Sequence, residues 1–167
     1  MKTKFYLWLC IAVIAIQSCY KDEPRRYTPD TSPTLHAFIL PNWYVWEALN
    51  SRTTAVMQSG SFNLTGVAVD SNRISITING PLEDSISYYL GYGALNTGVY
   101  SQGTNIGIPS WVTNGHSTCT GSFKLTKLDT VNKLISGDFK FYAFRSTDSS
   151  FRNVTDGGFR NIKYSIQ

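Results

Sequence analysis

Polar and hydrophobic side chains alternate with a period of two over residues 73–78. Ile74, Ile76 and Ile78 alternate with three polar residues over 73–78. This spacing places one face of a β-strand in a core and the other in water. The turn sequence Asn-Gly-Pro follows at 79–81 and ends the pattern. We therefore expect a half-buried strand here.

The same alternation recurs in two later segments that flank a polar stretch. Phe123 and Leu125 carry the first, and Phe139 and Phe141 the second. Residues 128–133, LDTVNK, have the composition of a turn, so residues 121–145 predict one long β-hairpin. Shorter strands are expected at 35–40, 44–49, 62–69, 86–90 and 159–166.

Helix signals are weak in this region. The best helical window, 43–50, carries aromatic and β-branched residues that favour strands. The chain's 13 glycines, with many Ser, Thr and Asn, separate short apolar runs. The pattern predicts an all-β fold, an antiparallel β-sandwich or small barrel built from hairpins, with little helix after the N-terminal signal. Residues 91–115, rich in Gly, Asn and Tyr, show no pattern that assigns a strand partner.

The N-terminal segment has the layout of a secretory signal. Lys2 and Lys4 precede an uncharged apolar run over 5–16, and the small residue Ser18 comes just before Cys19. A membrane-spanning helix needs about 20 apolar residues, more than this run supplies. A buried core helix is the alternative, but the basic start and abrupt polar switch fit export better. We expect residues 1–18 to be a signal peptide.

The residues around Cys19 resemble known lipoprotein signals. Ile16-Gln17-Ser18-Cys19 is similar to the lipobox of bacterial lipoproteins, which implies that Cys19 becomes the first residue and is acylated, for example with palmitate. Lys21, Asp22 and Glu23 resemble the surface-export signal of lipoproteins from the Bacteroidetes phylum. The resemblance implies a lipid anchor on Cys19 in the outer membrane and exposure at the cell surface. The alternative for the three charges is a solvated tether.

The expected organisation is a signal peptide at 1–18, the lipidated Cys19 with a proline-rich tether at 19–34, and one β domain at 35–167. The signal removes two basic residues and leaves 13 basic and 11 acidic side chains, a net charge of +2. The sequence pI of about 9.0 therefore overstates the case for nucleic acid, and no nucleic-acid partner is expected.

Three motifs resemble one family of uncharacterised β-rich Bacteroidetes lipoproteins over 35–166. They are NWYVWEA at 42–48, GSFKLTKLDTVNKLISGDFKFYAF at 121–144 and VTDGGFRNIKYSI at 154–166. The resemblance implies a domain of unknown function and supplies no catalytic residues. From the residues themselves, we expect Gly137, Gly157 and Gly158 to supply backbone freedom at hairpin ends or bulges, where a positive φ can occur.

Candidates for metal and thiol chemistry are few. His36 and His116 are the two histidines, and neither lies in a His-Glu-x-x-His pattern. His116 and Cys119 have half the spacing of a zinc site, without a second pair. We expect no metal and no cofactor, and we interpret Cys119 as a core residue rather than a reactive thiol.

Catalytic patterns are equally weak. No Gly-x-Ser-x-Gly nucleophile motif occurs. Glu47, Glu83 and Asp84 are available as acid and base, but nothing in the sequence pairs them. The sequence therefore favours a binding protein over an enzyme, with a hydrolase as the less favoured reading.

Aromatic residues make up 14% of the chain, and Trp43, Trp46, Trp111, Tyr88 and Tyr92 are the candidate ligand-binding rings. Such rings stack on sugars or anchor protein partners. The alternative is packing, because sheets favour aromatic side chains. Residues 43 and 45 would share one strand face, and residues 44 and 46 the other.

The expected function is a cell-surface lipoprotein that binds a glycan or a protein. The alternative is an immunity or inhibitor lipoprotein that shields the cell from a toxin or hydrolase.

Overall fold

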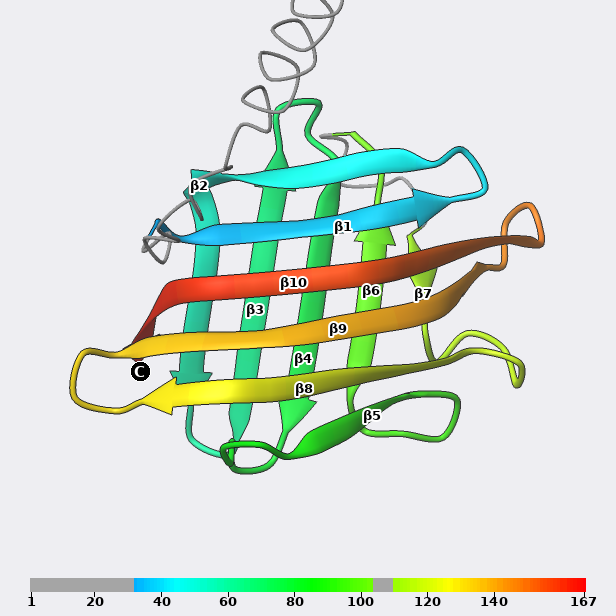
Figure 1. Ribbon diagram of the computed structural model, residues 1–167. Helices are drawn as coiled ribbons and strands as arrows, with labels where there is room; N and C mark the ends of the chain where they lie inside the picture. The colour runs from blue at the N-terminus through cyan, green and yellow to red at the C-terminus, as the bar shows by residue number, and fades with distance from the viewer. Residues whose placement is uncertain (1–31, 104–109) are drawn as a thin grey trace, which may run out of the picture. The chain divides into compact units, whose positions relative to one another are not determined.

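The computed structural model describes residues 32–103 and 110–167, and residues Thr31–Gln167 form one compact unit (Figure 1). The expected signal peptide, Cys19, Lys21, Asp22 and Glu23 lie outside the described residues. Within the described ranges the chain forms strands and no helix, and therefore no helix that could cross a membrane. The all-β prediction is confirmed.

Ten strands account for the regular structure of the described residues. They are β1 (Thr34–Leu40), β2 (Tyr44–Gln58), β3 (Ser61–Ala68), β4 (Arg73–Asn79), β5 (Ser87–Gly91), β6 (Thr97–Ser101), β7 (Trp111–Val112), β8 (Thr120–Asp129), β9 (Leu134–Arg145) and β10 (Ser150–Ile166). The predicted hairpin is β8–β9, and its turn is closed by Asp129, whose Oδ1 accepts from the backbone N of Asn132 at 2.8 Å. Asx turns of this kind are a common way to end a strand.

The strands pair in a circuit that returns to its start. β1, β2, β3, β4, β6, β7, β9 and β10 pair in that order, β10 pairs back to β1, and β8 and β5 extend from β9. Every pairing is antiparallel except the contact of the end of β10 with β2. Figure 1 shows β1, β10, β9 and β8 crossing in front of β3, β4 and β6, so the core lies between two crossing layers.

Strand β2 joins the two layers. Its first residues pair with β1, and its last residues pair with β3 and with the end of β10. The register with β3 shifts between Ala48 and Thr53, which marks the bend of a strand that passes from one layer to the other. Because β2 belongs to both layers, a continuous strand joins them at the end of the sandwich away from the β1–β2 turn (Figure 1).

Two strands are longer than the sequence indicates, and two more fall in the unassigned region. β2 continues to Gln58, β10 begins at Ser150, and β6 and β7 lie within 91–115. The alternation fails in β10 because its register with β9 shifts twice, at bulges where Asp156 and Asn161 have positive φ. Each bulge moves the side-chain pattern by one residue and hides it from a period-two search.

Of Gly137, Gly157 and Gly158, expected at hairpin ends or bulges, Gly157 lies at the first bulge of β10. None of the three has a φ in the left-handed region, and the positive φ at the first bulge belongs to Asp156. Gly137 pairs with Phe159, and a Cβ on Gly137 would lie 2.3 Å from the Phe159 ring and 2.2 Å from the Lys124 carbonyl. These glycines are needed for close approach of a ring or backbone, as when an aromatic side chain covers a glycine across a sheet.

Gly137→Ala tests this packing. We expect the free energy of unfolding to fall by about 1–3 kcal/mol, because the added methyl group must displace backbone or ring atoms in a filled core. Lys140→Ala, at an exposed position on the same strand, should change it by less than about 0.5 kcal/mol. Urea unfolding measures both variants, and equal stability of Gly137→Ala and wild type would contradict this account of the core.

Candidate functional site

The outer face of the layer formed by β5, β8, β9, β10 and β1 carries a groove, here called the outer-face groove. It consists of two hollows of about 490 and 500 Å³ that share Ser122 and Lys140. The charged or ionisable side chains of the first hollow are His36, Lys124, Asp138, Lys140, Asp156 and Arg160. Thr120, Tyr142, Asn153 and Thr155 line the second.

Strand register explains why these side chains meet. Tyr142 of β9 lies opposite Thr120 of β8 on one side and Asn153 of β10 on the other. Two residues along β9, Lys140 lies opposite Ser122. Side chains two residues apart on a strand share a face, so the groove is built row by row from neighbouring strands.

The groove is hollow because short side chains occupy its middle, and larger ones stand at its sides. Ser122 is flanked by Tyr89 of β5, which is 52% exposed. At one end, the ring of Tyr142 is stacked on that of Phe151, with centroids 5.0 Å apart and planes 3° apart. That contact fixes the orientation of the tyrosine ring at the edge of the second hollow.

Charges of both signs line the first hollow. Arg160 pairs with Asp138 at 2.7 Å and also donates to the Gly137 carbonyl. Lys124 lies opposite Asp138 in the register of β8 and β9. Both partners of the ion pair are well exposed, so it orients side chains more than it stabilises the fold.

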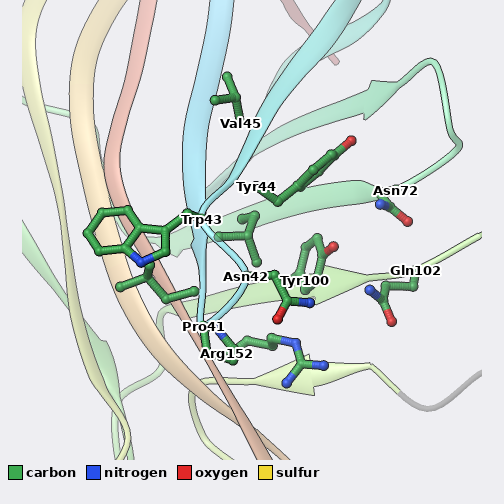
Figure 2. A pocket seen from close by; sticks show the side chains of 11 residues that line it. Pro41, Asn42, Trp43, Tyr44, Val45, Asn72, Tyr100, Gln102 and Arg152 are labelled. Atoms are coloured by element: carbon green, nitrogen blue, oxygen red, sulfur yellow. The ribbon is translucent and has the colours of Figure 1, made fainter.

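A separate pocket, here called the end pocket, lies beside the β1–β2 turn. It has a volume of about 410 Å³ and is lined by residues 39–45, Asn72, Tyr100, Gln102 and Arg152. Figure 2 shows Asn42, Tyr100, Gln102 and Arg152 on one side of this turn, with the Trp43 ring projecting to the other. Trp43 has positive φ and is 75% exposed, because the turn carries it away from the core.

The three candidate tryptophans have different roles. Trp43 is exposed, as required of a binding ring, whereas Trp46 and Trp111 are fully buried and present no ring face to a ligand. The Trp46 indole N–H donates to the backbone carbonyl of Asn72 at 3.1 Å. This bond holds Asn72, which lines the end pocket, in position. The sequence pattern cannot distinguish a ring that binds from a ring that supports.

Trp111 is the centre of a second supporting network. The guanidinium carbons of Arg145 and Arg152 lie 3.7 and 4.5 Å from its ring centroid. Its indole N–H donates to Ser150 Oγ at 2.9 Å, and that hydroxyl donates to Asp148 at 2.6 Å. Asp148 also forms an ion pair with Arg145, so the network ties the two-residue strand β7 to the β9–β10 turn.

Two tyrosines of the end pocket keep their protons at neutral pH. Burial, followed by the hydrogen bond to Asp70, raises the pKa of Tyr44 to about 12. Burial also raises the pKa of the Tyr100 phenol, although the nearby Gln102 side chain and Arg152 charge act in the opposite direction. Both phenols therefore remain neutral groups around the Arg152 cation.

The remaining candidates lie apart from these sites. The Tyr88 hydroxyl donates to the Pro81 carbonyl and accepts from the Glu83 backbone N, so this residue of β5 holds the preceding loop against its own strand. Tyr92 is 58% exposed but lines neither the groove nor the end pocket. Cys119 is buried, and burial raises the pKa of its thiol, which agrees with a core residue. No group of three or more metal-ligating side chains occurs among residues 32–103 and 110–167.

Comparison with known protein families assigns the chain to one of them. Residues 40–163 match the domain of unknown function DUF6252. The chain belongs to this family. No curated protein and no solved structure matches it. The match starts at the last residue of β1 and ends within β10. It therefore covers both tryptophan networks and the residues given for the end pocket and the outer-face groove, except Ile39 and His36.

Several residues of the groove and the end pocket in this DUF6252 domain were not among the candidates from the sequence, because the sequence carries only weak signals for them. Tyr142 and Thr155 lie in the motif segments, and Asn153 directly precedes the last of them. Their meeting depends on the pairing of β9 with β10, whose register the bulges shift. Arg152 lies in a stretch where no strand was expected, and its place beside Trp111 follows from a contact 41 residues apart in the sequence. No local pattern carries that information.

The ion pair of Asp148 predicts a pH-dependent stability. Hydrogen bonds from Arg145 and Ser150 hold the pKa of Asp148 below its ordinary value. A carboxylate with a depressed pKa stabilises the fold above its unfolded pKa of about 4, and this contribution is lost as the pH falls. Asp148→Asn should therefore lower the unfolding free energy at pH 7, and the difference from wild type should narrow between about pH 4 and 2.

Urea unfolding across this pH range measures the effect. Asp84→Asn, in the loop before β5, is the matched control and should run parallel to wild type at every pH. A constant difference between Asp148→Asn and wild type from pH 7 to 2 would contradict the role assigned to the ion pair.

Proposed function

We propose that this DUF6252 protein is a lipoprotein of the cell surface that binds an extended glycan in the outer-face groove. Acylated Cys19 would hold it in the outer membrane, as the lipobox-like sequence suggests. One observation carries the binding proposal. The two contiguous hollows have a floor of short hydroxyl side chains, with the stacked Tyr142 ring at one end and charged groups at the other.

These features match the chemistry of sugars. Sugar hydroxyls exchange hydrogen bonds with hydroxyl, amide and charged side chains, which Ser122, Thr120, Asn153 and Lys140 supply. The apolar face of a sugar ring packs against an aromatic face, as Tyr142 offers. The groove is open and shared between two hollows, so it suits a chain of linked units better than one compact ligand. Side chains on paired strands also keep their positions without a ligand, which favours binding.

One observation favours the second candidate, an immunity or inhibitor protein that binds another protein. Trp43 is exposed on a turn outside the groove, and exposed tryptophans are frequent anchors in protein interfaces. A protein partner would need a patch of about 800 Å² around this turn. The two functions use different surfaces and can be separated by substitution.

Oligosaccharide binding tests the glycan proposal. In calorimetric titrations of the purified protein with neutral and acidic hexasaccharides, we expect at least one to bind. Tyr142→Ala should weaken that binding about tenfold, close to 1.4 kcal/mol, and Ser122→Trp should abolish it by filling the groove. Trp43→Ala is the matched control with an exposed ring removed outside the groove. Binding that depends on Trp43 and not on Tyr142 would contradict the assignment of the groove.

Membrane attachment is tested by Cys19→Ala. Acyl chains contribute about 0.8 kcal/mol for each buried methylene, so the wild type should fractionate with the outer membrane and the variant should not. Treatment of intact cells with protease should remove the wild-type domain before lysis. Survival of the domain until lysis would place it on the periplasmic side, and membrane retention of Cys19→Ala would contradict lipidation.

A further inference from the structure

We propose that the end pocket is a second binding site, which takes the carboxylate of a small organic acid with Arg152 as its counter-ion. The pocket shares no lining residue with the outer-face groove, so the proposal does not depend on glycan binding. Its volume of about 410 Å³ is in the range of small-molecule sites.

Charge is the first argument. Arg152 is the one charged side chain among the described residues that line the pocket. It is partly buried, and no carboxylate of the described residues lies within 4.0 Å of it. Among the described residues, the one other partly buried arginine is Arg145, and it is paired with Asp148. A partly desolvated cation without a partner attracts an anion.

The nearby carboxylate, Asp70, is engaged elsewhere. Its Oδ1 accepts from the backbone N of Asn72 at 3.0 Å, and its Oδ2 accepts from Asn72 Nδ2 at 2.7 Å and from the Tyr44 hydroxyl. It does not line the pocket. These bonds hold the Asp70 side chain in the β3–β4 turn, where it forms no ion pair with Arg152.

Arg152 is held in position before any ligand arrives. Its guanidinium carbon lies over the Trp111 ring, and its Nη1 donates to the Phe151 carbonyl at 2.9 Å. A guanidinium has five N–H donors, so these contacts leave several for a ligand. Planar donors of this kind match the two oxygens of a carboxylate, and prior positioning lowers the entropy lost on binding.

The rest of the pocket suits an organic acid rather than a bare inorganic ion. Asn42 and Gln102 offer amide groups on the same side of the turn as Arg152 (Figure 2). Ile39, Leu40 and Pro41 offer apolar surface for a carbon skeleton. Small-molecule sites commonly combine apolar walls with a few convergent polar groups.

Two sources of such a carboxylate are separated by the choice of probes. N-acetyl-alanine represents the end of a peptide, and galacturonate represents an acidic sugar. Their uncharged counterparts are N-acetyl-alaninamide and galactose. Calorimetry with the purified protein should show millimolar or tighter binding of at least one acid and at least tenfold weaker binding of its neutral counterpart. Equal binding of acid and neutral probe, or no binding of either acid, would overturn the proposal.

Substitutions locate the binding. Arg152→Gln should reduce the affinity for the acid at least tenfold, and Arg152→Lys, which keeps charge without the planar fork, should give an intermediate loss. Arg145→Gln is the matched control, because it removes the other cation beside Trp111 but does not line the pocket. An equal loss in Arg145→Gln would assign the effect to Trp111 packing and overturn the proposal.

A second variant covers the case in which Arg152→Gln fails to fold. Gln102→Trp keeps Arg152 and its contact with Trp111 but fills the pocket, so acid binding should be lost while thermal unfolding stays near that of wild type. Undiminished binding in Gln102→Trp would place the acid elsewhere and reject the end pocket as its site.

Discussion

The narrow space between the two crossing layers is the constraint on which this fold depends. Several large rings fill that space where a facing backbone carries no side chain. Phe141 reaches across to Gly98, where a Cβ would lie 2.9 Å from its ring, and a Cβ on its β8 partner Gly121 would lie 2.5 Å from the Phe141 Cβ. Phe159 covers Gly137 and stacks on Phe123 with ring planes 9° apart. Interiors are packed to crystal density, so each glycine sets where a ring can lie and how closely the strands approach.

The same packing determines how rigidly the side chains of the surface sites are positioned. Side chains on the outer face of β8, β9 and β10 alternate with the core residues Phe123, Phe139 and Phe141 along the same strands. Because the inner residues are locked by packing, the outer residues keep fixed spacing and direction. Sites on strands held in this way are better preorganised than sites on free loops. The core therefore positions the groove floor, because short side chains on the outer face alternate with bulky core side chains along the same strands.

Part of this structure could be predicted from the sequence because part of it is local. The period of two and the turn at Asp129 predict the β8–β9 hairpin, and both are properties of adjacent residues. Alternation also assigns Trp46 to one strand face, but it does not say that a second layer covers that face. The groove and the end pocket depend on register between distant segments, on bulges in β10 and on glycines opposite rings. None of these is visible in a local pattern.

The two arginines beside Trp111 show how a supporting network differs from a binding one. Arg145 lies 3.7 Å from the ring centroid and is neutralised by Asp148, so it can hold β7 against the β9–β10 turn by itself. A second cation on the same ring adds cation–π attraction of about 0.5–2 kcal/mol but also repulsion and loss of hydration. Fold stability alone therefore gives little reason for Arg152 to lack a carboxylate. The asymmetry is explained if the missing negative charge comes from a ligand in the pocket that Arg152 lines.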